Sequence, residues 1–517
     1  SFGLHNVTAM TMVLARKGFS STSCMFRNSF DSEILDQINA GNTDGQTMNA
    51  VDSETARASY MARVNYNYAS KYLVEFNIRR DGSENFAPDK RWGTFASASL
   101  GWVISEEPFF ESLKNTINFL KIRGSYGTLG NDNTGGVSFP FYSRFELYQG
   151  AVASNGFMNN LGDYAFGDLV TKGLVPGAIA NSLATWEKSN KANIALDATL
   201  FNNLNFTVDL FTERRTNILT QRTAEVPSSF GGTLPLENIG IVNNKGIDLS
   251  LNYHNSIGKV NYSVGGNFTF ARNKIVEMAE AEGTSEYMRQ TGRPINGYYG
   301  YKTDGIFQSQ EEIDSYAKQE VAGVGYETQI GDIKYVDVDG NGVVNSDDMT
   351  YLGYGNIPEI IYGINGSLNW KNFDFSFLMQ GAANAQVYLK GGIILPYFNQ
   401  GNLPQFWVNE AWTEENPSNR YPRLAESVHN FPATDVPGVQ TYLYNASYLR
   451  LKNIEVGYTF PTSWLSRIGV TNARVYVNAQ NLFTISNVPQ IDPENTEQEG
   501  WTYPQMKSFN FGLSLQF

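Results

Sequence analysis

The residues that end the chain, 507–517, alternate strictly between apolar and polar side chains. One face carries Phe509, Phe511, Leu513, Leu515 and Phe517, and the other carries Asn510, Gly512, Ser514 and Gln516. Because successive side chains of a β-strand point to opposite faces, the segment is predicted to be a strand with one apolar face. Its length matches the roughly 9–11 residues that a tilted strand needs to cross the hydrocarbon layer of a membrane. A half-exposed antiparallel sheet in a soluble protein shows the same alternation, so this pattern alone leaves both folds open.

The alternation recurs upstream and predicts a long series of strands. Thirteen are expected, at residues 58–68, 71–80, 91–104, 118–128, 186–199, 205–215, 245–254, 260–271, 359–370, 373–381, 447–458, 474–483 and 507–517. Residues 1–30 are expected to add one or two strands with a weaker pattern. The total of about 13–15 strands exceeds what a small sheet needs, so closure into a barrel has to be considered.

The connections between these strands alternate between short and long. Short ones are expected at 69–70, 105–117, 200–204, 255–259, 371–372 and 459–473, and long ones at 81–90, 129–185, 216–244, 272–358, 382–446 and 484–506. Short periplasmic turns and long extracellular loops are typical of outer-membrane barrels. We therefore predict an all-β fold, an antiparallel transmembrane β-barrel in the bacterial outer membrane. Its lumen is too wide for side chains to fill, which makes it a pore or a plugged channel.

Composition agrees with this fold and excludes several functions. Charged residues make up 17% of the chain, below the usual value of about 25%, whereas aromatic residues reach 14%. A net charge of −13 excludes a nucleic-acid partner, because phosphate binding needs a basic surface. The single Cys24 cannot form an internal disulfide, and the histidines His5, His254 and His429 lie in no metal-ligand spacing. Without a G-x-S-x-G nucleophile elbow either, we predict that the chain is not an enzyme.

Several segments resemble one family in their order along the chain. They are Arg79-Arg80-Asp81-Gly82-Ser83 with residues 91–102, then residues 120–133, 243–248, 298–307, 447–453 and 477–483. This series is similar to the C-terminal half of the SusC/RagA family of TonB-linked outer-membrane transporters of Bacteroidetes. The terminal Phe517 also resembles the signal that the barrel-assembly machinery recognises.

The resemblance implies a barrel of about 22 strands, of which residues 1–517 are the C-terminal part. It places the plug domain, the TonB box and the early strands outside this chain. It further implies import energised by TonB, with a SusD-like surface lipoprotein as partner and an oligosaccharide or oligopeptide as cargo. The alternative is a passive porin-like pore or a structural barrel without energy coupling.

One acidic segment, residues 337–348, is a candidate metal site. Its oxygen donors are Asp337, Asp339, Asn341, Asn345 and Asp348, with a backbone carbonyl from Val343. These occupy loop positions 1, 3, 5, 9, 12 and 7 of an EF-hand-type calcium loop, and Gly342 stands at position 6 for the sharp turn. The sequence therefore predicts a Ca²⁺ site here, with a metal-free Asp-Gly-Asn-Gly turn as the alternative.

Aromatic residues in the long loop 382–446 are the candidates for substrate contact. They are Tyr397, Phe398, Trp407 and Trp412. Flat aromatic faces suit sugar rings or apolar peptide side chains. The alternatives are packing of the loop against its neighbours and a place in the aromatic belt at the membrane interface.

Overall fold

The computed structural model is dominated by one large β-sheet. It describes the chain except residues 1, 33, 35–36, 148–162, 167–168, 173, 178, 223–233, 322–324, 399–400, 418–419, 426–428, 431–437, 466–468 and 496–498. Within the described part, fourteen strands pair in chain order from β1 to β27. No helix in that part is long and apolar enough to cross a lipid bilayer.

The strands of the large sheet match those expected from the alternation. They are β1 (His5–Phe26), β2 (Thr47–Tyr68), β3 (Tyr72–Ser83), β4 (Trp92–Val103), β5 (Ile117–Asn131), β10 (Glu187–Leu200), β11 (Leu204–Gln221), β12 (Leu236–Ile257), β13 (Val260–Glu277), β20 (Ile360–Trp370), β21 (Phe373–Ala383), β25 (Tyr448–Thr459), β26 (Asn472–Ser486) and β27 (Ser508–Gln516). All thirteen predicted strands are present, and residues 1–30 contribute one more. The predicted all-β fold is confirmed.

Several strands are longer than predicted. β1, β2 and β12 each have 22 residues, and the expected loop 216–244 shrinks because β11 and β12 continue into it. The alternation in the sequence marks the part of a strand that has an apolar face. Beyond that part apolar and polar residues no longer alternate strictly, and backbone pairing with the neighbouring strand maintains the strand.

The chain divides into two compact units. The first comprises Ser1–Leu100, Ser125–Lys191 and Arg215–Gly240. In it, β1 pairs with β2 from His5↔Tyr68 to Phe26↔Thr47, and β2 pairs with β3 through a tight turn in which Ala69 and Ser70 have positive φ. Two successive positive φ values match the twist of a two-residue hairpin turn. The short pairs β6 (Phe145–Leu147) with β9 (Leu174–Pro176) and β7 (Asp163–Phe166) with β8 (Leu169–Lys172) lie in its long connection.

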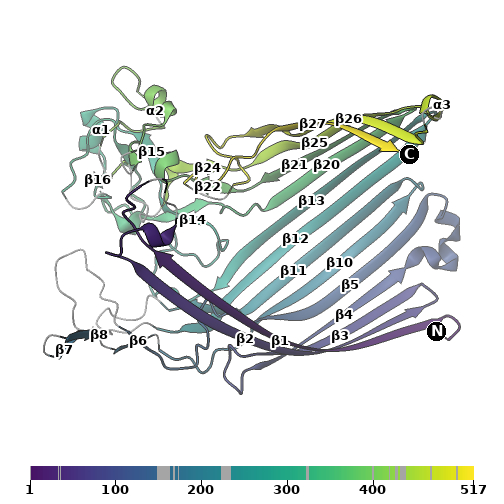
Figure 1. Ribbon diagram of the computed structural model, residues 1–517, viewed down its shortest axis with the longest axis horizontal. Coiled ribbons are helices and arrows are strands. Elements are labelled where there is room, and N and C mark those ends of the chain that lie inside the picture. The colour runs from purple at the N-terminus through teal and green to yellow at the C-terminus, as the bar shows by residue number, and fades with distance from the viewer. Residues whose placement is uncertain are drawn as a thin grey trace. The chain divides into compact units, whose positions relative to one another are not determined.

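The second unit comprises Gly101–Gly124, Ala192–Arg214 and Ile241–Phe517. Its strands β13, β20, β21, β25, β26 and β27 lie side by side, antiparallel to one another (Figure 1). The apolar side chains of β27 are exposed, as they are on the neighbouring Val475 and Val477. On the opposite face, Arg474 bonds to Asp374 and to Glu455 at 2.6 Å, so ion pairs bridge three strands. One face is thus apolar and the other carries the charge, as a strand exposed to lipid requires.

The loops 278–359 and 384–447 of this unit fold together into a body of their own, called here the loop body (Figure 1). Its strands are β14 (Tyr298–Tyr301), β15 (Thr303–Ile306), β16 (Lys318–Gln319), β17 (Ile333–Tyr335), β18 (Val343–Val344), β19 (Thr350–Gly353), β22 (Gln386–Tyr388), β23 (Gly438–Val439) and β24 (Leu443–Asn445), and its helices are α1 (Gln310–Ser315) and α2 (Gln405–Glu410). A further α-helix, α3 (Thr462–Leu465), lies in the turn between β25 and β26. The long connection expected at 272–358 has structure of its own, because its apolar residues share one core with the next loop.

Candidate functional site

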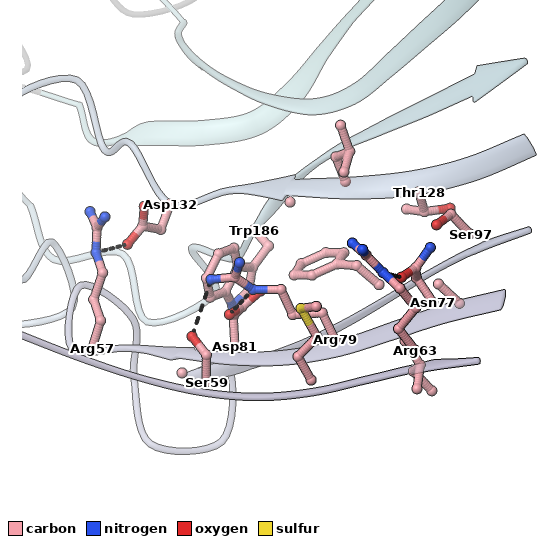
Figure 2. Close-up of a pocket in the computed structure, with 17 residues that line it drawn as sticks. Arg57, Ser59, Arg63, Asn77, Arg79, Asp81, Ser97, Thr128, Asp132 and Trp186 are labelled. Carbon is pink, nitrogen blue, oxygen red and sulfur yellow. Dashed lines mark hydrogen bonds and ion pairs between the residues drawn. The ribbon is translucent and has the colours of Figure 1, made fainter. Parts of the chain in front are cut away.

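A pocket of about 490 Å³ lies on the polar face of the first unit (Figure 2). Its wall is built from β2, β3, β4 and β5. Odd-numbered residues of β2 and β3 share the face of the sheet that forms this wall. The even-numbered neighbours Tyr60, Val64 and Phe76 are exposed on the opposite, apolar face. The alternation that gives these strands an apolar surface therefore also gathers polar side chains on the pocket side.

Three arginines line this pocket: Arg57, Arg63 and Arg79. Nε of Arg57 lies 2.9 Å from a carboxylate oxygen of Asp132, which is nearly buried. Nε of Arg79 donates to both oxygens of Asp81, at 2.6 and 2.8 Å. Two of the three guanidinium groups thus have a carboxylate partner.

Arg63 has a different partner. Its Nε donates to the amide oxygen of Asn77 at 2.7 Å, directly across the β2–β3 pair. The Asn77 Nδ2 donates in turn to Glu75 at 2.7 Å, which fixes the orientation of the amide. Figure 2 shows the Arg63 guanidinium beside Asn77, on the same strand face as Arg79.

An aromatic cluster forms one end of the pocket. The ring of Trp186 lies 5.4 Å from those of Phe86 and Phe95, and its Nε1 donates to the backbone oxygen of Arg91 at 3.2 Å. Gly130 lies so close to the Phe95 ring that a Cβ at this position has no room. The pocket therefore has one rigid aromatic end and one charged wall.

The structure separates the four aromatic candidates. Trp407 has no exposed surface, packs against Tyr421 and Phe406, and donates from Nε1 to the Ile394 carbonyl at 2.7 Å. This burial favours packing over substrate contact for Trp407, and Phe398 also packs against the same core. Tyr397 is 60% exposed.

Trp412 is partly exposed at the edge of the loop body. Its Nε1 donates to Gln308 at 2.9 Å, and its ring covers Gly331, which has positive φ. The four candidates therefore do not form one binding face: Trp407 and Phe398 pack against the core, whereas Tyr397 is exposed and Trp412 is half-buried over Gly331.

The acidic segment 337–348 forms a compact loop. Carboxylate oxygens of Asp337, Asp339 and Asp348 lie within 4.8 Å of one another. Backbone amides bind these carboxylates: Gly342 and Gly340 donate to Asp337 at 2.8 and 2.7 Å, which lowers the pKa of the Asp337 carboxyl. The three carboxylates thus converge, as a Ca²⁺ site requires.

The other expected donors of this loop have roles in shaping it. The Asn341 Oδ1 accepts from the amide of Val343 at 2.7 Å, and Asn345 caps the turn of residues 346–348. Asp348 is fully buried and accepts from the amides of Val338 and Asn345. The donor set fits a hard oxygen-binding cation, because every side chain that converges offers oxygen.

Sequence patterns gave no indication of a buried polar cluster inside the loop body. Asp332 is fully buried and accepts from Arg423 at 2.7 Å and from Asn430 and Tyr326 at 2.8 Å. The neighbouring His429 stacks on Tyr326, and burial lowers the pKa of its imidazole. The partners come from segments about a hundred residues apart, so no local motif could have identified them.

The chain resembles known proteins along its length. A family model described as TonB dependent receptor-like, beta-barrel matches residues 18–307. TonB-dependent receptor P26 of Formosa agariphila is 31% identical and aligns with 89% of this chain and 46% of its own length. TonB-dependent receptor P3 of the same organism is 28% identical and aligns with 100% of this chain and 51% of its own length. TonB-dependent receptor SusC of Bacteroides thetaiotaomicron is 30% identical and aligns with 89% of this chain and 43% of its own length.

Solved structures show the same fold. The RagAB peptide transporter is similar with a TM-score of 0.73 at 22% identity, over 99% of this chain and 53% of that one. The RagAB peptide importer in its open-open state gives a TM-score of 0.75 with the same identity and coverage. The chain spans about half the length of the relatives that it matches.

Proposed function

The chain belongs to the TonB-dependent receptor-like β-barrel family and lies in the bacterial outer membrane, and from this premise we propose that it forms the barrel wall of an energised nutrient importer. In this proposal the plug domain and the TonB box lie outside these 517 residues. The family consists of receptors and transporters, not enzymes. The barrel encloses the path of the cargo, and the protein makes no covalent change in it.

The match of the barrel family model over residues 18–307 carries this proposal. The cargo we propose is an oligosaccharide or an oligopeptide, because SusC is among the relatives and RagAB is described as a peptide transporter. We propose a SusD-like surface lipoprotein as the partner that covers the loop end of the barrel. The packed core of the loop body supports this, since a docked partner needs a surface of fixed shape.

Uptake measurements test the proposal against a passive pore. Labelled oligosaccharides and oligopeptides are offered to cells that express the full-length protein, to cells that lack it, and to cells that express it without TonB. The proposal expects uptake in the first cells alone. Uptake that persists without TonB would establish the porin-like alternative instead.

We also propose that Asp337, Asp339, Asn341, Val343, Asn345 and Asp348 hold a Ca²⁺ ion that stiffens the loop body. The convergence of three carboxylates within 4.8 Å supports this site. Calorimetric titration of the full-length protein with Ca²⁺ tests it, comparing the native protein with Asp339→Asn. The matched control is Asp314→Asn, which alters an exposed acid on α1 outside the loop. Saturable binding that Asp339→Asn weakens and the control does not is expected; absence of binding to the native protein contradicts the site.

The exposed ring of Tyr397 and the partly exposed ring of Trp412 are the proposed substrate contacts in the loop body. Alanine at either position is expected to weaken cargo binding several-fold, because an aromatic face contributes through stacking and buried area. Binding of the cargo by the two variants is compared with binding by Val408→Ala, which removes another exposed apolar side chain nearby. Equal affinity in all three variants contradicts a contact by either ring.

A further inference from the structure

The pocket in Figure 2 has more guanidinium groups than carboxylates within reach. Asp132 pairs with Arg57 and Asp81 pairs with Arg79, whereas Arg63 is bonded to the neutral amide oxygen of Asn77. In the described part of the chain, no carboxylate lies within ion-pair distance of Arg63. Glu75 accepts a hydrogen bond from the Asn77 amide, which lies between this carboxylate and the Arg63 guanidinium.

A further arginine lies on the same face. The register of the β1–β2 pair places Arg16 directly opposite Arg57, so both side chains leave the sheet on one side. Like charges directly opposite each other destabilise an antiparallel pair. No carboxylate among the described residues pairs with Arg16, and the nearby ion pair of Lys17 and Glu54 is a diagonal contact, since Lys17 stands opposite Ala56 and Glu54 opposite Phe19. Asp132 balances the charge of Arg57 but not that of Arg16, so an anion that binds beside the two arginines relieves the remaining repulsion.

This concentration of positive charge contrasts with the rest of the protein. The whole chain has a net charge of −13, so its average field repels anions. A pocket that is to hold an anion in such a protein needs a local excess of cations. The volume of about 490 Å³ lies within the usual range for a small-molecule site, roughly 300–1,000 Å³. The pocket can therefore enclose one monomer unit of a larger cargo.

We propose that Arg63, with Arg57 and Arg79, binds a carboxylate group of the imported oligomer, which is therefore acidic. The proposal rests on the importer function proposed above and adds the chemical class of the cargo. A guanidinium group presents a planar fork of N–H donors that binds a carboxylate through two parallel hydrogen bonds. The Nη atoms of Arg63 can serve this role, since its hydrogen bond to Asn77 uses Nε. The hydroxyl of Ser59, 3.3 Å from Arg79, adds a further donor to the same wall.

Calorimetry on the purified full-length protein tests the proposal. The probes are tri-galacturonate and maltotriose for the saccharide source, and tri-glutamate and amide-capped tri-alanine for the peptide source. One acidic probe is expected to bind at least about tenfold more tightly than its neutral counterpart. Raising NaCl from about 0.05 to about 0.5 M is expected to weaken that binding, because salt screens exposed charges.

Variants of Arg63 test whether this residue binds the acidic probe. Arg63→Gln is expected to lower the affinity for the acidic probe about tenfold and to leave the affinity for the neutral probe unchanged. Arg63→Lys keeps the charge but loses the fork of N–H donors, so a smaller loss of affinity is expected. The matched control is Arg214→Gln, since Arg214 also bonds to an asparagine oxygen, that of Asn243 at 3.5 Å, but lies outside the pocket. The control is expected to bind both probes as the native protein does.

Two results overturn the proposal. One is that neither acidic probe binds more tightly than its neutral counterpart; the other is that Arg63→Gln lowers the thermal midpoint but leaves the affinity for the acidic probe unchanged, which makes the arginine structural. TonB-dependent uptake of a neutral oligomer is measured in the same variants. If that uptake persists, the importer function stands while the acidic cargo is rejected.

Discussion

Replacement of Trp407 by alanine tests whether the loop body is held by its own core. The indole has no exposed surface and its Nε1 donates to the Ile394 carbonyl at 2.7 Å. Removing a buried tryptophan costs about 3–5 kcal/mol, since it combines lost transfer energy with a cavity. The carbonyl that loses its donor adds to this cost. The free energy of opening of the loop body is therefore expected to fall by at least about 3 kcal/mol.

Hydrogen exchange of the full-length protein in detergent measures this change. Amides of β14, β17 and β22 are expected to exchange more than about a hundredfold faster in Trp407→Ala, because each 1.4 kcal/mol is a factor of ten in the opening equilibrium. The control is Tyr397→Ala, whose ring is 60% exposed, with an expected change within about 0.5 kcal/mol. Unchanged protection in Trp407→Ala, or an equal loss in the control, refutes the idea of a cooperative core.

Three further changes probe other parts of the protein. Arg450→Met leaves Asp492 and Glu494 without the buried cation that bonds to both, so thermal unfolding in detergent is expected to show a loss of about 3–5 kcal/mol; a midpoint equal to the native one contradicts this. Burial holds the pKa of His429 below its ordinary value, so the stability that this residue contributes is present above about pH 6.5 and is lost as pH falls. Amide exchange in the loop body should therefore speed up at acid pH in the native protein and less so in His429→Gln; equal responses of the two proteins contradict it. Gly130→Ala forces a methyl group into a phenylalanine ring and is expected to cost about 1–3 kcal/mol, measured as a lower thermal midpoint, whereas an unchanged midpoint shows that the ring moves freely.

The sequence predicts the strands well because each one carries its own signal. Residues such as Phe509, Phe511 and Leu513 alternate within a single segment, and no distant partner is needed to recognise the pattern. The strand ends are predicted less well, since β1 and β2 continue for many residues without strict apolar–polar alternation. There the strand is maintained by pairing with its neighbour, which the hydropathy of one segment does not encode.

The candidate sites show the same difference between local patterns and contacts between distant segments. The acidic segment 337–348 is local, so its spacing alone predicted that the carboxylates of Asp337, Asp339 and Asp348 converge, and they do. The arginine pocket is assembled from four strands, and only the register of the sheet brings Arg63 beside Asn77. The burial of Trp407 has the same origin, because its core includes residues from two loops.

We propose that this barrel belongs to an importer that uses energy. The most direct test of this proposal is the ratio of periplasmic to external concentration of a labelled cargo at steady state, in cells that express the full-length protein. An energised importer accumulates its cargo, so the ratio should exceed one and fall when TonB is removed. A ratio of one, independent of TonB, would show that the cargo merely equilibrates through a passive pore.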